Sequence, residues 1–334
     1  MPMWWCNNSG RRQTSGAETP VGAATKGDTD HMIKASPRTA LDLVLSPTPP
    51  PARAGGIGLA LLRIVAGLLW LAHVWWKVPP DFGEDGRTGL WFWTHLAVDH
   101  PVFPPYSWLV EHLVLPNFTP FGWLVLVVET LLPVLLLTGT AVRLAALIGI
   151  GQSVAIGLSV AQAPNEWPWA YAMMIGIHLV LLLAPSAQYA AVDAVRAARI
   201  AGDPAPVARR LLGGWGVILA LIAIVAGVKS LGDEFLAPRG RGVSYPPLQL
   251  FLGDYNMLAT LALLVIAGLM LAAAVMRAPA LALGAAIVAA VAALTIYVQL
   301  GRGEVWLGGN PSTAAVFVCA AVIAVGARPL RVSS

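Results

Sequence analysis

The chain has 334 residues, of which 57% are hydrophobic and only 11% are charged. A soluble domain carries roughly 25% charged residues, so this composition excludes an ordinary cytosolic enzyme and a disordered protein, and it predicts a polytopic membrane protein. The net charge is +4, but no basic run is interleaved with aromatic residues, so we expect no nucleic-acid partner.

Residues 1–55 differ in composition from the rest of the chain. They are rich in Pro, Gly, Ser, Thr and Ala, and they offer too little apolar surface to form a core. No apolar segment typical of a signal peptide follows their charges. We expect a disordered cytoplasmic N-terminal tail, with Met32 as an alternative start.

Eight apolar segments follow the tail, each near the ~20 residues that cross ~30 Å of hydrocarbon as a helix. They are residues 57–77, 119–138, 142–162, 169–187, 212–230, 256–275, 279–299 and 312–328. The long apolar connection 78–118 contains helix-like pieces near 88–98 and 106–114, and we expect it to cap the outer membrane surface. The sequence therefore predicts an all-α protein of the plasma (cell) membrane with about eight transmembrane helices.

Arginine is unevenly distributed between the two sets of connections. With the N-terminus inside, the cytoplasmic connections are rich in Arg, whereas the outer connections are longer and also rich in Asp and Glu. The positive-inside rule then places both termini in the cytoplasm. The arginines on which this orientation depends are Arg53, Arg143, Arg196, Arg199, Arg209, Arg210, Arg277, Arg328 and Arg331.

The apolar segments fall into two groups of four. Residues 121–143 run from an aromatic residue through a Leu/Val stretch to an arginine, and residues 255–277 do the same with equal spacing. We predict two four-helix units, 57–200 and 211–328, the second a degenerate repeat that has lost its buried polar residues. Similar Ala and Leu composition is the alternative explanation of this likeness.

The cysteines limit the redox chemistry that the chain itself can carry. Cys6 and Cys319 are too few and too far apart for a disulfide framework, an iron–sulfur cluster or a zinc site, and no haem attachment motif occurs. We expect no metal, haem or iron–sulfur cofactor. Electrons would have to pass through a diffusible cofactor or the cofactor of a partner.

Four ionisable residues lie inside the segments of the first unit: Arg63, His73, Glu129 and His178. An Arg or Asp at a helix centre costs at least ~2.5–3.5 kcal/mol on insertion scales, and such residues persist where they pair or function. A rise of ~1.5 Å per residue places Arg63, Glu129, His178 and also Gln152 at similar depth. We predict a polar cluster there, with a salt bridge between Arg63 and Glu129.

Two further patterns lead outward from this depth. His73 and Lys77 are one helical turn apart near the outer end of the first segment, so they face the same side. In the fourth segment, residues at helical spacing form a stripe from the outer surface to His178. They are Trp167, Tyr171 and Met174. Each feature has a structural alternative: a salt bridge that joins helices, a hydrogen-bonded histidine and a stripe of packing residues.

A set of residues across about 57–195 carries a family resemblance. They are Leu62, Arg63, Gly67, His73, Lys77, Glu129, Gly139, Arg143, Asn165, Glu166, Trp167, Pro168, Trp169 and His178. With this set the first unit resembles the DoxX/DoxD membrane family, which includes the membrane subunit of thiosulfate:quinone oxidoreductase, and it is closer to the DoxD branch. The resemblance implies a four-helix bundle and quinone-linked oxidation of a small sulfur compound. The second half does not resemble the small partner subunit sometimes fused to such proteins.

On this interpretation the expected site residues form three groups. The catalytic group consists of His178, Glu129 and Arg63. Arg63 holds Glu129 ionised, and Glu129 and His178 handle protons. The quinone-binding group is Trp167, Tyr171, Met174 and Gln152. The group that binds the anionic sulfur substrate is His73 and Lys77. The expected partners are the lipid bilayer, the quinone pool and a soluble or membrane redox subunit.

Two other functions stay open on the sequence. One is a non-enzymatic membrane scaffold that anchors redox partner proteins, and the other is a small-molecule carrier, for which a repeat would be typical. Both predicted units begin on the inner side, which favours simple duplication over the inverted repeat of many carriers. Quinone bound after purification would favour the oxidoreductase over both alternatives.

Overall fold

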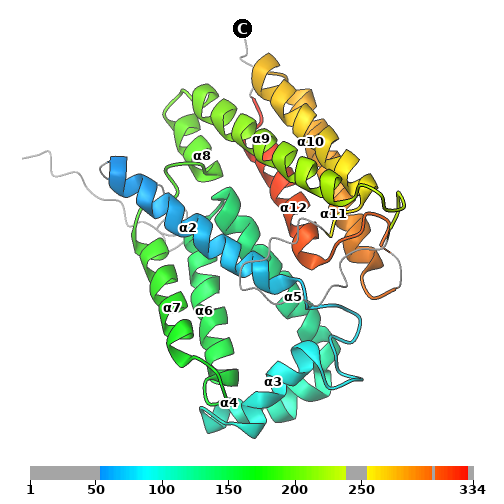
Figure 1. The fold of residues 1–334 in the computed structure, drawn as a ribbon. Coiled ribbons are helices and arrows are strands. Elements are labelled where there is room, and N and C mark those ends of the chain that lie inside the picture. Colours follow the sequence, from blue (N-terminus) through cyan, green and yellow to red (C-terminus); the bar gives the residue numbers. More distant parts are fainter. Residues whose placement is uncertain (1–52, 238–253, 303–304, 330–334) are drawn as a thin grey trace, which may run out of the picture. The chain divides into compact units, whose positions relative to one another are not determined.

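The computed structural model describes residues 53–237, 254–302 and 305–329, and every named element in these ranges is a helix (Figure 1). Six helices of the described part are long and apolar enough to cross a membrane, and two shorter apolar helices have 16 residues each. The prediction of an all-helical polytopic membrane protein is confirmed at this level. The predicted tail lies outside the described residues, apart from its last three positions.

The first four predicted segments are all helical. They correspond to α2 (Arg53–Val74), α5 (Phe118–Thr138), α6 (Val142–Val160) and α7 (Pro168–Leu183). α2 packs against α5, and α6 packs against α7. α5 ends at Gly139, whose φ of 64° lies in the left-handed region that glycine adopts without steric cost. This cap turns the chain directly into α6.

The connection between α2 and α5 is helical in two places, as predicted. α3 (Gly89–Asp99) packs on α6 and, with α4 (Pro104–Leu109), lies across one end of the first helices (Figure 1). α4 is not a separate piece, because it continues through a π-helical and a 3-10 turn into α5. The hydroxyl groups of Tyr106 and Ser159 are 2.9 Å apart and tie α4 to α6.

The second half repeats the pairing of the first: its first helix packs against its second, and its third against its fourth. A short helix, α8 (Val192–Ile200), precedes them. They are α9 (Ala205–Lys229), α10 (Met257–Met276), α11 (Pro279–Gln299) and α12 (Pro311–Gly326). α9 begins earlier than predicted, so Arg209 and Arg210 lie in its first turns, where both are exposed.

The two halves pack against each other through α12, which contacts both α2 and α5. Most of α12 is buried, and its many alanines allow neighbouring helices to approach closely. Ser312 Oγ donates to Leu71 O at 2.5 Å, and Tyr297 donates to the hydroxyl of Thr130 at 3.3 Å. The described helices therefore belong to one compact unit. The degenerate repeat stays a prediction.

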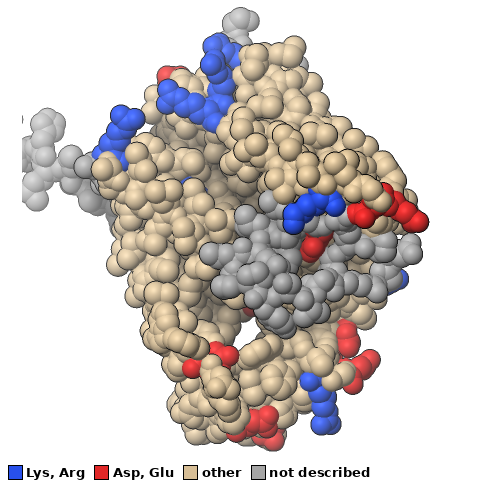
Figure 2. Space-filling model, viewed as in Figure 1, with Lys and Arg blue, Asp and Glu red and all other residues tan. Residues whose placement is uncertain are grey.

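Charged residues are segregated along the helices. The described arginines of the predicted cytoplasmic connections lie at the starts of α2, α6 and α9, in α8, and just after α10 and α12. Figure 2 shows most of the blue side chains at one end of the molecule and most of the red ones toward the other, where single blue side chains also occur. Such a distribution is typical of a multi-pass membrane protein that obeys the positive-inside rule. Which end faces the cytoplasm stays a prediction.

Candidate functional site

A polar cluster joins the turn after α2 to α5 and α6, and we call its three residues, Lys77, Glu129 and Gln152, the lysine–glutamate cluster. Lys77 Nζ lies 2.5 Å from Glu129 Oε2, and Gln152 Nε2 donates to Glu129 Oε1 at 3.0 Å. The side chains of Lys77 and Glu129 are each only 3% exposed. The sequence correctly placed Glu129 and Gln152 at one depth. It did not predict that Lys77, rather than Arg63, pairs with Glu129.

The ammonium group of Lys77 has three contacts that offset its burial. Besides Glu129, Nζ donates to His73 O at 2.6 Å and lies 3.7 Å from the ring centroid of Trp76. A carboxylate, a carbonyl and an aromatic face together replace the hydration of the charge. The ring of His73 is exposed, so the two predicted substrate-binding residues differ: Lys77 turns into the protein and His73 presents its ring outward.

The predicted salt bridge between Arg63 and Glu129 is wrong. Arg63 is fully buried, and all its hydrogen bonds go to backbone carbonyl oxygens near the end of α5 and after α7. These are the carbonyls of Leu136, Leu137, Ser186, Tyr189 and Ala190. Helix C-termini leave such carbonyls unpaired, and a guanidinium group can satisfy several of them at once. Arg63 therefore acts as a clamp between α5 and the segment after α7.

His178 forms a separate contact with α2. Trp70 Nε1 lies 3.1 Å from His178 Nε2, and His178 Nδ1 lies 2.7 Å from Met174 O. Because the indole N–H only donates and the carbonyl only accepts, the ring is neutral, with its proton on Nδ1. Both nitrogens are engaged, and His178 is completely buried. This is the geometry of the hydrogen-bonded histidine that the sequence left open as an alternative.

The single cluster predicted from depth is thus three separate contacts, made by Arg63 and Trp70 of α2 and by Lys77 after its end. Arg63 and Trp70 are seven residues apart in α2, which corresponds to about 10 Å along the helix, and Lys77 follows the end of α2 at Val74. The estimate of depth failed because the position of each residue was counted from the end of its apolar segment in the sequence, and these ends do not lie at the same level in the folded protein. It also placed Lys77 on the outer surface at the end of the first segment, whereas the chain turns after Val74 and Lys77 reaches back to α5.

The predicted quinone-binding residues of the stripe on α7 differ in their contacts. Trp167 is 64% exposed and packs edge-on against Trp169. Tyr171 donates to Glu166 Oε2 at 2.6 Å, and Met174 packs against the core between α2, α5 and α6. Among the four predicted quinone-binding residues, Gln152 is the one that belongs to the lysine–glutamate cluster.

Sequence reasoning missed Trp70, Trp76 and Gly149. A Cβ atom added at Gly149 would lie 2.2 Å from His178 Nε2, so α6 needs a glycine where the imidazole packs against it. A glycine inside a helix costs about 1 kcal/mol relative to alanine. Its presence in the predicted helix 142–162 therefore indicated that another group packs closely against the helix at this position. The chain has 13 tryptophans, and nothing in the sequence distinguished Trp70 and Trp76 from the others as contacts of the buried polar residues.

Gly149→Ala is expected to destabilise the protein by at least ~1–3 kcal/mol, because the added methyl group overlaps the buried imidazole of His178. Gly151→Ala is the matched control on the same helix, since nothing lies within 4 Å of its added methyl group. The measurement is chemical unfolding of both variants in detergent. Equal stability of the two variants would contradict the close packing of His178 on α6.

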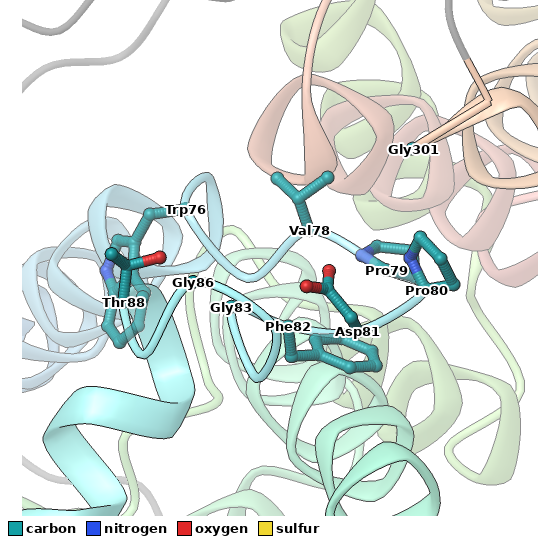
Figure 3. Close-up of a pocket in the computed structure, with 11 residues that line it drawn as sticks. Trp76, Val78, Pro79, Pro80, Asp81, Phe82, Gly83, Gly86, Thr88 and Gly301 are labelled. Atoms are coloured by element: carbon teal, nitrogen blue, oxygen red, sulfur yellow. The ribbon is translucent and has the colours of Figure 1, made fainter.

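A pocket of about 470 Å³ lies in the loop that follows α2, with Trp76 as one of its lining residues (Figure 3). Because Lys77 lies against the ring of Trp76, the pocket adjoins the lysine–glutamate cluster. Asp81 is the charged residue among those that line it. An acidic lining does not favour the anionic sulfur substrate that the sequence placed at this end of α2.

The chain matches no family model, no curated protein and no solved structure. The resemblance to the DoxX/DoxD family therefore depends on the residues quoted in the sequence analysis. Within the described residues, no group of three or more His, Cys, Asp or Glu side chains is placed to hold a metal ion.

Proposed function

We propose that the chain is a DoxD-like membrane subunit of a quinone-linked oxidoreductase that acts on a small sulfur compound such as thiosulfate. The observation that carries the proposal is the lysine–glutamate cluster, buried between three apolar helices. Ionisable residues at membrane depth are costly and mark functional sites by default. The reaction class comes from the resemblance of residues 57–195.

The donors of the cluster fit a quinone. Gln152 Nε2 donates to the Glu129 carboxylate from α6, and Lys77 Nζ, just after α2, forms an ion pair with the same carboxylate. The second amide hydrogen of Gln152 has no hydrogen-bond partner among the described residues. When bound, a quinone supplies an acceptor for two electrons and two protons, and its carbonyl oxygens need donors of this kind. The electrons would come from two thiosulfate ions that join through a new S–S bond.

The residues of the chain would hold and replace a proton. Lys77 carries its proton on Nζ, between Glu129 Oε2 and His73 O. Glu129 balances the charge of Lys77 and fixes its position. A proton given up from Nζ would be replaced from the side of His73, whose exposed ring belongs to the residue one helical turn away.

Arg63 and His178 would support this site as structural residues. The guanidinium group of Arg63 is committed to carbonyl oxygens, and both ring nitrogens of His178 are hydrogen-bonded. Neither group has a free donor or acceptor for a ligand in this arrangement. Of the predicted catalytic group, Glu129 is therefore the residue we assign to proton handling, together with Lys77.

The test is quinone reduction by the full chain, purified in mild detergent with the subunits it retains and assayed with thiosulfate, sulfite and sulfide. We expect bound quinone after purification and donor-dependent formation of quinol. Ser159→Ala, which changes a contact between α4 and α6, is a control that should keep the rate. No bound quinone and no reduction with any donor would overturn the proposal, and co-purified soluble enzymes would then favour a scaffold.

A further inference from the structure

The pocket that follows α2 is a fixed feature of the fold. Thr88 N donates to Gly83 O at 2.9 Å, and Trp91 N donates to Phe82 O at 3.2 Å, so the loop folds onto the start of α3. Phe82 is buried against Gly122 of α5, where a Cβ atom would lie 2.2 Å from its ring. These contacts anchor the loop to the bundle.

The loop is also fixed from the second half of the chain. A Cβ atom at Gly301 would lie 1.8 Å from Pro79 O, and Gly301 has a φ of 73°. Only glycine allows this approach, and it brings the loop after α11 to the wall of the pocket (Figure 3). The volume of about 470 Å³ is in the usual range for small-molecule sites.

The charged and polar groups of the pocket favour a positively charged ligand. Figure 3 shows the carboxylate of Asp81 turned toward Val78, and it has no hydrogen-bond or ion-pair partner among the described residues. Pro79 and Pro80 offer carbonyl acceptors but no N–H donor. The rest of the wall consists of the apolar or aromatic side chains of Trp76, Val78 and Phe82, the hydroxyl-bearing Thr88 and four glycines. A single carboxylate is too few for a metal ion.

The nearby cations do not neutralise Asp81. Lys77 is paired with Glu129, and the guanidinium carbon of Arg87 lies 5.7 Å from the ring centroid of Trp91. Arg302 follows the lining residue Gly301 and is exposed, and among the described residues it forms no ion pair with Asp81. The other charged residues of the loop, Glu84 and Asp85, are acidic. Asp81 is thus the charged residue of the pocket lining, and its carboxylate opposes the binding of an anion.

We propose that this pocket binds a small organic cation, whose ammonium group lies against the Asp81 carboxylate while its apolar part fills the space beside Trp76 and Pro80. This site lies beyond the proposed quinone chemistry and does not depend on it. The ammonium group could belong to a free amine or to a lipid headgroup, since the two share this chemistry. An aromatic and carboxylate lining is the usual means of binding such groups in proteins.

The test is calorimetric titration of the full chain, in nanodiscs of phosphatidylglycerol, with choline and with its uncharged isostere that has carbon in place of nitrogen. We expect saturable binding of choline and at least about tenfold weaker binding of the isostere. Asp81→Asn should weaken choline binding by about tenfold or more, whereas Asp85→Asn, in the same loop but outside the pocket lining, should not. Thiosulfate should not compete with choline.

Absence of saturable choline binding, equal binding of the isostere, or unchanged binding by Asp81→Asn would overturn the inference. A second series in nanodiscs that contain phosphatidylcholine identifies the source of the ammonium group. Loss of choline binding there assigns the pocket to a lipid headgroup, and unchanged binding assigns it to a free amine; both results support a cation site. Quinone is left out of every titration, so failure here is distinguishable from failure of the proposed function.

Discussion

Glu129→Gln is expected to lower the free energy of unfolding by ~3–5 kcal/mol, because the ammonium group of Lys77 is then buried without its counter-charge. The amide keeps the size of the side chain, so loss of packing does not explain such a change. The measurement is chemical unfolding of purified protein in detergent. Glu166→Gln is the matched control: this carboxylate is half-buried and accepts one bond from Tyr171, so we expect ~1 kcal/mol or less.

The double variant Lys77→Met, Glu129→Leu should recover most of this loss. Replacement of a buried ion pair by apolar residues of similar volume is often neutral or stabilising, because both desolvation costs are removed together. A strong coupling energy in the double-mutant cycle is therefore expected. If the losses of unfolding free energy of the two single variants add up to that of the double variant, Lys77 and Glu129 do not interact. The proposed site would then have to be assigned to other residues.

Arg63→Met is expected to cost at least ~3 kcal/mol, because several buried carbonyl oxygens lose their donor at once. Arg63→Lys should cost less but remain destabilising, since an ammonium group cannot bridge carbonyls on two segments in the way a planar guanidinium does. Both values come from chemical unfolding in detergent.

A second result separates this clamp from the salt bridge that the sequence predicted. Arg63→Met combined with Glu129→Gln should give additive losses, because Arg63 of α2 and Glu129 of α5 share no hydrogen bond or ion pair. Recovery of stability in the combined variant would restore the original pairing and contradict the clamp.

The fold was largely accessible from the sequence because apolar length is a strong signal. Helices cover every one of the predicted segments, and the helical pieces of the outer loop were found as well. The join between α4 and α5 was missed because Pro116 and the π-helical turn interrupt the local pattern without ending the helix. The early start of α9 was missed because its first turns carry Arg209 and Arg210.

The site was predicted only in part because its partners are set by tertiary contacts. Depth along the helices was enough to bring Glu129 and Gln152 together. The true partner of Glu129 was missed because Lys77 lies beyond the end of α2 and was counted as an outer surface residue. Arg63 was assigned to a carboxylate because unpaired backbone carbonyls leave no mark in a sequence.

The most direct test of the central claim is quinone reduction by the double variant Lys77→Met, Glu129→Leu in nanodiscs, with thiosulfate or whichever sulfur donor the wild type uses. This variant removes both charged groups of the lysine–glutamate cluster while an apolar pair keeps the helices packed. We predict a folded protein whose rate of quinone reduction is at least 10²-fold below that of the wild type, as expected when the groups that handle the proton are lost. A folded double variant that reduces quinone at the wild-type rate would contradict the assignment of Lys77 and Glu129 to the site.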